Sequence, residues 1–426
     1  MSVADLAIVA ALVFGWGTLS ARLERFDVTA PIVFVLAGLL LTHGPLAVLG
    51  FTPSDELIKT LAEFTLALVL FSDASRVGLH ELRADSGLYL RLLGVALPLT
   101  IALGTLLAVA LTGTSIWLAL LVGAALAPTD AALGAGMMAN PVVPARIRRL
   151  INVESGLNDG IATPFVSVAI AGVAGGHGTA HGPAAAMAEL VLGVGVGVAV
   201  GGVGGLLVNA ARRRGWAAEG FGGAAVLGLA VCAYASAVAM HGNGFIAAFV
   251  AGLAFGTAGG RRGEPLVPFV EETGALVSLL VWLAFGAVEL VPAVESLTWQ
   301  MVLYAILSLT VVRMVPVLAA LTGARLDWAT NILVAWFGPR GLASVVFALL
   351  ALEELGRPTA GRAVAVITIT VVISIVAHGA TAEPLARRYA ARLDRPAAGS
   401  TAVQPPDVPD RRLIRREARR GITPHG

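Results

Sequence analysis

Charged residues are scarce in this chain. Asp, Glu, Lys and Arg together make up 13% of its 426 residues, whereas hydrophobic residues make up 57%, and the mean hydropathy is +0.85. Soluble domains carry about 25% charged residues. The composition therefore excludes an ordinary soluble domain. It indicates an all-α polytopic membrane protein, because apolar segments that cross a bilayer do so as helices or closed barrels.

Other absences narrow the class further. Cys232 is the single cysteine, which excludes an intrachain disulfide and a metal site built from several cysteines. The first apolar stretch, residues 6–19, is preceded only by the charge of Asp5 and is followed by Arg22 and Arg25. A signal peptide has the opposite order of charges, so we expect a retained first helix. We find no room for a cytoplasmic nucleotide-binding domain, and we expect no cofactor.

Apolar stretches recur along nearly the whole chain. About 20 such residues are needed for a helix to cross the hydrocarbon core, and the sequence predicts thirteen membrane-spanning helices. In chain order, spans 1 to 13 are residues 4–21, 30–49, 56–75, 87–111, 115–138, 147–173, 184–211, 220–240, 243–258, 271–291, 299–322, 328–352 and 362–386.

Arginine is concentrated on one side of the predicted spans. The connections after odd-numbered spans hold most of the arginines, and the opposite connections hold almost none apart from Arg357 and Arg362. Cytoplasmic loops carry the excess of basic residues. We therefore expect a multi-pass protein of the inner (plasma) membrane, with its N-terminus outside and its C-terminus in the cytoplasm. Residues 391–426 are basic and lack an apolar period, which predicts a disordered cytoplasmic tail.

Two predicted spans are interrupted at mid-course. Span 5 contains Pro128, and span 12 contains Gly-Pro-Arg-Gly at residues 338–341. Proline removes a backbone donor and clashes with the preceding turn. Broken helices occur at membrane depth only where they line a cavity or are buried in protein. The breaks lie seven spans apart, so they have opposite orientations. This predicts inverted repeats of spans 1–6 and 8–13, the alternative being incidental glycine and proline.

Span 7, which would join the repeats, contains four glycines at intervals of four residues: Gly193, Gly197, Gly201 and Gly205. Small residues at this spacing let a second helix approach closely. The ladder therefore predicts a packing face rather than a chemical site.

Carboxylates within the apolar stretches are the most informative residues. Asp130 follows the break in span 5, and Glu154 and Asp159 lie on span 6. A charge at membrane depth costs roughly 2.5–3.5 kcal/mol on insertion scales, so it usually marks an ion or proton path. Ser155 and Asp159 are four residues apart and share a helix face. We expect this face to point at the break in span 5.

A dehydrated sodium ion prefers hard oxygen ligands. The Thr129 carbonyl, the carboxylates of Asp130 and Asp159, and the Ser155 hydroxyl form such a set. The alternative is that these acids only form ion pairs with arginines and hold helices together. This structural role is favoured most for Glu154.

Three motifs taken together resemble those of a known family. They are Ala-Pro-Thr-Asp at 127–130, Glu-Ser-Gly-Leu-Asn-Asp-Gly at 154–160 and Gly-Pro-Arg-Gly at 338–341. They are similar to motifs of sodium/proton antiporters of the NhaP type. These belong to the monovalent cation/proton antiporter group, which also contains the animal Na⁺/H⁺ exchangers. The glycine-rich stretch at 241–252 is similar as well, and the resemblance covers roughly residues 1–390.

The resemblance implies a fold of thirteen membrane helices. Two unwound helices would cross within a six-helix core, and a scaffold domain would form a homodimer. The transmembrane antiporter domain would cover residues 1–390. Its core spans would lie at about 87–173 and 299–386, and its scaffold spans at about 4–75 and 184–291.

The resemblance also implies roles for individual residues. Asp159 would bind either the cation or a proton, and Asn158 would hold the broken span in place. The Thr129 carbonyl, Asp130 and Ser155 would complete a Na⁺ site.

Other charged residues match the family pattern less directly. Some relatives use a glutamate on span 3, where this chain has the shorter Asp73, so direct coordination by Asp73 stays open. A lone arginine at membrane depth needs an acid. The family pattern suggests that Glu154 pairs with Arg313 of span 11, with Arg340 as the alternative partner. Arg340 would otherwise offset carbonyl dipoles at the break of span 12, and both arginines are expected to be structural.

The function that these observations predict is antiport of Na⁺ or Li⁺ against H⁺, with both ions competing for Asp159. A single acid in the Asn158-Asp159 pair predicts electroneutral 1:1 exchange by alternating access, serving pH homeostasis. K⁺/H⁺ antiport stays open, because the ligand set does not decide cation size. An ion channel is the less favoured class, since inverted repeats favour alternating access. An intramembrane aspartyl protease would need a second catalytic motif, so no enzyme and no nucleic-acid partner are expected.

Overall fold

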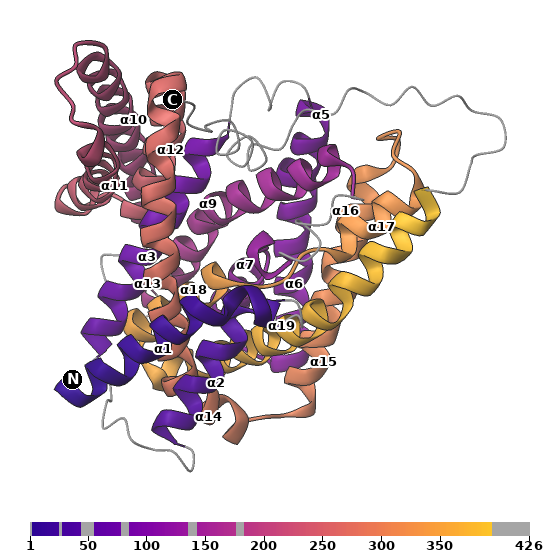
Figure 1. The fold of residues 1–426 in the computed structure, drawn as a ribbon. Coiled ribbons are helices and arrows are strands. Elements are labelled where there is room, and N and C mark those ends of the chain that lie inside the picture. Colours follow the sequence, from indigo (N-terminus) through magenta and orange to yellow (C-terminus); the bar gives the residue numbers. More distant parts are fainter. Residues whose placement is uncertain are drawn as a thin grey trace, which may run out of the picture.

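The computed structural model describes residues 2–24, 28–43, 55–77, 85–134, 143–175 and 183–393, and it is all-helical over these residues (Figure 1). The first half comprises α1 (Val3–Leu23), α2 (Ala30–Thr42), α3 (Asp55–Arg76), α5 (Ser86–Tyr89), η2 (Leu90–Ala96), α6 (Leu97–Thr112), α7 (Ile116–Ala125), η3 (Ala131–Gly134), α9 (Ala145–Gly175) and α10 (Pro183–Arg213). The second half comprises η4 (Glu219–Phe221), α11 (Gly222–Ala239), α12 (Gly244–Gly263), η5 (Glu264–Leu266), α13 (Val267–Val288), α14 (Leu290–Glu295), α15 (Trp299–Leu307), η6 (Ser308–Val312), α16 (Arg313–Leu321), α17 (Trp328–Trp336), α18 (Leu342–Leu355) and α19 (Arg357–Leu393).

The helices follow the apolar stretches of the sequence. Eight of those described are long and apolar enough to cross a membrane, and three more are apolar but shorter. The all-helical membrane class is therefore confirmed, while the count of thirteen crossings stays a prediction. The predicted tail is wrong at its start, because α19 continues to Leu393. The remainder of that tail, 394–426, lies outside the described residues.

Local signals explain several helix ends. Ser2 and Asp5 form a reciprocal capping box at the start of α1, which satisfies backbone donors that have no partner within the helix. Ser115 caps α7 and Asp327 caps α17 through side-chain oxygens. At the end of α6, Gly113 adopts a left-handed conformation with φ of 62°, which glycine adopts at little cost. The helices α7 and α17, which begin at the capped residues, end at Ala125 and Trp336, directly before the predicted breaks.

The helices pack in two groups. In the first group, α10 and α3 both pack along α12, and α13 packs along α2 and α3. In the second, α7 packs on α6 and α9, while α19 packs on α15 and α18. Figure 1 shows α10, α11 and α12 together on the left and α15, α16, α17 and α19 on the right. The helices α3, α9 and α18 contact one another where the groups meet.

The glycine ladder on α10 forms a close helix contact, as predicted. A Cβ atom built at Gly197 or Gly201 would clash with backbone carbonyl oxygens of α12, and one at Gly193 would clash with the carbonyl oxygen of Asn243, the residue before α12. A side chain at these positions would push the two backbones apart. The packing role of the ladder is thus confirmed.

Candidate functional site

The breaks in the two interrupted helices lie against each other. Helix α7 ends at Ala125 and α17 ends at Trp336, and an unwound stretch follows each of them. The backbone N–H of Asp130 donates to the carbonyl oxygen of Pro339 at 2.8 Å. The unwound stretches thereby supply hydrogen-bond partners to each other, as backbone groups buried at membrane depth require.

Asp130 lies at this crossing, and its carboxylate faces the second break. Its Oδ2 accepts a hydrogen bond from the backbone N–H of Leu342 at 3.3 Å. Leu342 begins α18, so the carboxylate stands at the positive end of that helix. A Cβ atom at Gly341 would clash with the Asp130 side chain. Only glycine therefore fits beside Asp130 in the observed arrangement.

Two polar residues of α9 hold the break after α7. Ser155 Oγ donates to the carbonyl oxygen of Thr129 at 2.7 Å and accepts from the backbone N–H of Ala131 at 2.9 Å. The side-chain Nδ2 of Asn158 donates to Thr129 Oγ1 at 2.7 Å. Both predicted contacts of α9 with this break are present. They fix the orientation of the Thr129 carbonyl.

Asp159 lies one turn beyond Ser155 on α9. Its side chain is buried, and among the described residues its Oδ1 has no hydrogen-bond partner. A buried polar atom without a partner is costly, so native proteins rarely keep one without a reason. Asp159 therefore keeps a buried carboxylate oxygen that no described group satisfies. Glu154 Oε2 is a second such atom, on an acid whose other oxygen pairs with Arg313.

The acid predicted on span 3 approaches the same turn of α9. A Cβ atom at Gly156 would lie 3.1 Å from the Asp73 Cβ, so Asp73 of α3 packs directly on α9 between Ser155 and Asn158. Both Asp73 and Asp130 are close enough to Asp159 to interact with it electrostatically. The structure therefore brings three carboxylates together, from α3, from the first break and from α9.

Glu154 forms an ion pair with Arg313, as the family pattern suggests. Arg313 Nη2 lies 2.6 Å from Glu154 Oε1, and both side chains are buried. The alternative partner, Arg340, instead donates to the carbonyl oxygens of Ala127 at 3.0 Å and Pro128 at 3.3 Å. Arg340 thus neutralises carbonyl dipoles at the first break, rather than at the second where they were expected.

One local feature beside Arg313 is not predicted from the sequence. Residues 308–312 form the π-helical segment η6, directly before Arg313. Arg340 Nη2 reaches the carbonyl oxygen of Ser308 in this segment at 3.4 Å. Wide turns of this kind are frequent at functional sites. No feature of the residue pattern predicts this π-helical segment.

Three buried polar side chains near the breaks were also missed. Ser344 Oγ of α18 donates to the carbonyl oxygen of Ala125 at 2.6 Å. On α19, Ser374 and His378 contact the second break. A histidine within an apolar span is itself a signal of function, and it could have directed attention to α19.

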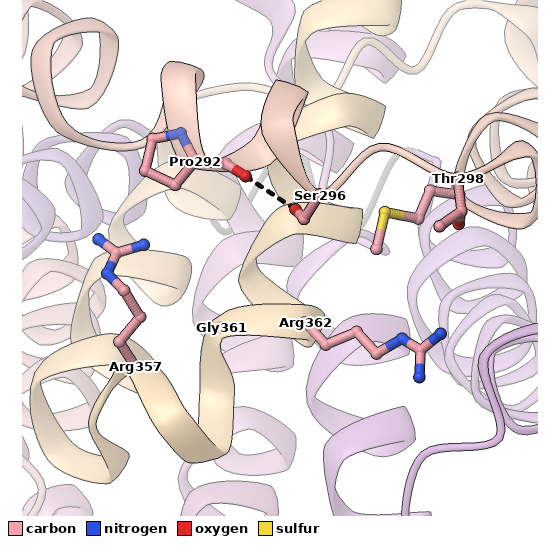
Figure 2. Close-up of a pocket in the computed structure, with 7 residues that line it drawn as sticks. Pro292, Ser296, Thr298, Arg357, Gly361 and Arg362 are labelled. Atoms are coloured by element: carbon pink, nitrogen blue, oxygen red, sulfur yellow. Dashed lines mark hydrogen bonds between the residues drawn. The ribbon is translucent and has the colours of Figure 1, made fainter.

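A cavity lies away from these residues, where α14, α15 and α19 meet (Figure 2). Its volume is about 390 Å³, and none of the predicted site residues lines it. Arg357 at its edge donates to the buried Glu289, with Nη2 2.8 Å from Oε1. Figure 2 shows the guanidinium groups of Arg357 and Arg362 pointing in different directions. Within the described ranges, no group of three or more His, Cys, Asp or Glu side chains could hold a metal ion.

Comparisons with known proteins agree on one family. The family model described as "Sodium/hydrogen exchanger, transmembrane" matches residues 8–388. Two curated relatives are uncharacterized Na⁺/H⁺ exchangers of Mycobacterium bovis and Mycobacterium tuberculosis. Each is 29% identical to this chain over 217 residues, or 49% of the chain. The match spans only 36% of the length of those relatives.

Solved structures show the same fold. The sodium proton antiporter MjNhaP1 from Methanocaldococcus jannaschii at pH 8 superimposes with a TM-score of 0.75 at 18% identity, over 91% of this chain and 98% of that one. A second structure of MjNhaP1, from an electron-microscopy map, gives a TM-score of 0.69 at 19% identity over the same shares.

Proposed function

Because the chain belongs to the sodium/hydrogen exchanger family, we propose that it is a secondary antiporter that exchanges Na⁺ or Li⁺ for H⁺ across the membrane. The observation that carries this proposal is Asp159. It is a buried carboxylate with an unpartnered oxygen, beside two crossed helix breaks. A carboxylate in that position binds one proton or one monovalent cation, and the two ligands exclude each other.

The neighbours of Asp159 supply the other groups that a cation needs. Asp130 and Asp73 add negative charge to its surroundings. Ser155 and Asn158 hold Thr129, so the ligand geometry is set before the cation arrives. A preorganised set of oxygens binds a cation without first paying to order the chain. We assign Thr129, Asp130, Ser155 and Asp159 to the Na⁺ site, and Asp73 to its edge.

We propose electroneutral 1:1 exchange, and the charges at the site support it. Asn158, the residue before Asp159, is neutral, and the charge of Glu154 is compensated by Arg313. If Asp159 is the one acid that titrates during the cycle, the same charge moves in each direction. We assign Asp130 and Asp73 to tuning the site rather than to carrying a second proton.

Alternating access fits the two groups of helices. We assign 87–173 and 299–386 to a moving core, and 4–75 and 184–291 to a scaffold through which two copies associate. Asp73 of α3 would then face Gly156 of α9 across the boundary between the scaffold and the core. Movement of the core along α3 would carry Asp159 from one side of the membrane to the other. The arginine distribution supports an outside N-terminus and a cytoplasmic C-terminus.

The test is cation-driven proton flux in proteoliposomes. With an imposed pH gradient and a pH-sensitive dye, adding Na⁺ or Li⁺ is expected to dissipate the gradient, and Asp159→Asn is expected to abolish this response. Asp327→Asn is the matched control, because asparagine is as good a helix N-cap as aspartate. Near wild-type flux in Asp159→Asn would overturn the proposed mechanism. A response to K⁺ alone would identify a K⁺/H⁺ antiporter, and cation flux without proton coupling would identify a channel.

A further inference from the structure

Two polar residues of α19 contact the break in the neighbouring interrupted helix. Ser374 and His378 lie one turn apart, and both are buried. Ser374 Oγ accepts a hydrogen bond from the backbone N–H of Arg340 at 2.7 Å. His378 Nε2 lies 3.1 Å from the carbonyl oxygen of Trp336. One turn of α19 therefore reaches both ends of the unwound stretch between α17 and α18.

The hydrogen bonds form a continuous chain. A carbonyl oxygen only accepts, so the contact with Trp336 requires a proton on His378 Nε2. His378 Nδ1 lies 3.2 Å from Ser374 Oγ and 3.0 Å from the Ser374 carbonyl oxygen. In the neutral ring with its proton on Nε2, Nδ1 accepts from the Ser374 hydroxyl, which itself accepts from Arg340. The Ser374 carbonyl oxygen only accepts as well, so in this form it is a close neighbour of Nδ1 and not a hydrogen-bond partner. The imidazole also packs against the Trp336 ring at a tilt of 31°, with centroids 5.2 Å apart.

These hydrogen bonds supply partners to backbone groups that have no helical hydrogen bond because the helix is interrupted. An unpaired backbone group at membrane depth costs several kcal/mol. The only partner that the described residues offer to the Arg340 N–H is Ser374. The Trp336 carbonyl accepts from both His378 and the N–H of Gly338, the latter at 2.8 Å.

The arrangement repeats one that the first break shows. On α9, Ser155 holds the backbone of Ala131, and Asp159 follows four residues later. On α19, Ser374 holds the backbone of Arg340, and His378 follows four residues later. The second residues differ in one respect. Asp159 keeps an unpartnered oxygen, whereas both ring nitrogens of His378 lie within hydrogen-bond distance of protein groups. The pair on α19 is thus closed to ligands.

Arg340 links the second break to the ion site. Its backbone is held by Ser374, and its guanidinium holds the carbonyl oxygens of Ala127 and Pro128. The next residue, Thr129, carries the carbonyl that Ser155 orients. We propose that Ser374 and His378 are positioning residues, which act through Arg340 to set the place of the Thr129 carbonyl at the cation site. This inference rests on the proposed antiport function.

The experiment compares Ser374→Ala with Thr370→Val in the full chain. Thr370 is the matched control, because among the described residues its buried hydroxyl donates to Val366 of its own helix alone, one turn earlier on α19. Na⁺-driven proton flux is measured in proteoliposomes over a concentration series, and the thermal midpoint is measured in detergent. Loss of an acceptor for a buried N–H is expected to raise the KM for Na⁺ about fivefold or more in Ser374→Ala. We expect the maximal rate to change less, and Thr370→Val to stay near wild type.

Two histidine variants keep the proposal testable if Ser374→Ala does not fold. His378→Gln retains a donor for Trp336 and is expected to lie closer to wild type than His378→Phe, which retains only the ring. An unchanged KM in folded Ser374→Ala would overturn the proposal, as would a lower thermal midpoint with an unchanged KM. An equal rise in the KM for Na⁺ in Thr370→Val would also overturn the proposal.

Hydrogen–deuterium exchange separates this inference from the proposed function. The backbone amide of Arg340 is expected to exchange faster in Ser374→Ala than in Thr370→Val, whether or not any ion is transported. If the wild-type protein transports no ions, the proposed function fails, but the hydrogen–deuterium comparison still tests the role of Ser374. Equal deuterium exchange at the Arg340 amide in the two variants would overturn the inference.

Discussion

Arg313 and Glu154 form an ion pair in the interior of the protein. Arg313 Nη2 lies 2.6 Å from Glu154 Oε1, and the side chains are 1% and 3% exposed. The two residues are 159 positions apart in the sequence. Each charge compensates the other, so neither is left alone in an apolar environment. Among the described buried acids near the breaks, Asp159, unlike Glu154, forms no ion pair with an arginine.

Removing one member of this pair is expected to destabilise the protein strongly. Glu154→Ala leaves Arg313 buried without its partner, which costs about 3–5 kcal/mol. The measurement is the thermal midpoint and the free energy of unfolding in detergent. Glu383→Ala is the control, because it breaks the exposed pair with Arg387 and should cost less than about 1 kcal/mol. The double change Glu154→Gln with Arg313→Gln should be milder than either single change. Unchanged stability in Glu154→Ala would contradict the assignment.

The α10–α12 contact predicts opposite effects at two adjacent glycines. A Cβ atom at Gly201 would clash with the backbone of Ala251, which cannot move aside as a side chain can. Overpacking of this kind costs about 1–3 kcal/mol. At Gly202 no atom lies within 4 Å of the added Cβ. Gly202→Ala should therefore be neutral, or stabilise α10 by up to about 1 kcal/mol. The measurement is the thermal midpoint of each variant in detergent. Equal midpoints would argue against close packing of α10 on α12.

Asp73→Ala is expected to weaken cation binding without abolishing exchange. Asp73 packs on α9 at Gly156 and lies near Asp159, so its carboxylate favours a cation at the neighbouring site. A rise of several-fold in the KM for Na⁺ follows, with little change in the maximal rate. The assay is Na⁺-driven proton flux over a concentration series. A folded variant with no exchange at all would show that Asp73 is essential rather than auxiliary.

Competition between the proton and the cation predicts how exchange depends on pH. Asp159 must be deprotonated to bind Na⁺, so the apparent affinity for Na⁺ should fall as pH falls. In the pH range where Asp159 is mostly protonated, mass action gives about a tenfold rise in the KM for Na⁺ for each unit by which the pH falls. Flux is measured over a pH series, at zero and at imposed membrane potential. A KM independent of pH would reject a single shared site. A rate that rises steeply with potential would reject 1:1 stoichiometry and point to Asp130 or Asp73 as a second proton carrier.

The sequence by itself determined the class of this protein and the positions of its breaks. Apolar stretches of about 20 residues specify membrane helices through composition alone. Pro128 and Pro339 each remove a backbone donor, which favours a break in the helix around them, although Pro164 lies inside the continuous helix α9. The four-residue spacing that joins Ser155 to Asp159, like the glycine ladder of α10, follows from helical periodicity. These signals are local, and one segment suffices to recognise them.

Tertiary structure decided which partners those local features have. Glu154 could pair with either of two buried arginines, and the approach of α16 to α9 selected Arg313. The carbonyls that Arg340 holds belong to the other break, some 213 residues away. The Ser374–His378 chain exists only because α19 packs beside that second break. Contacts of this kind depend on how helices distant in sequence are oriented, and the residue pattern of a single span carries no information about that orientation.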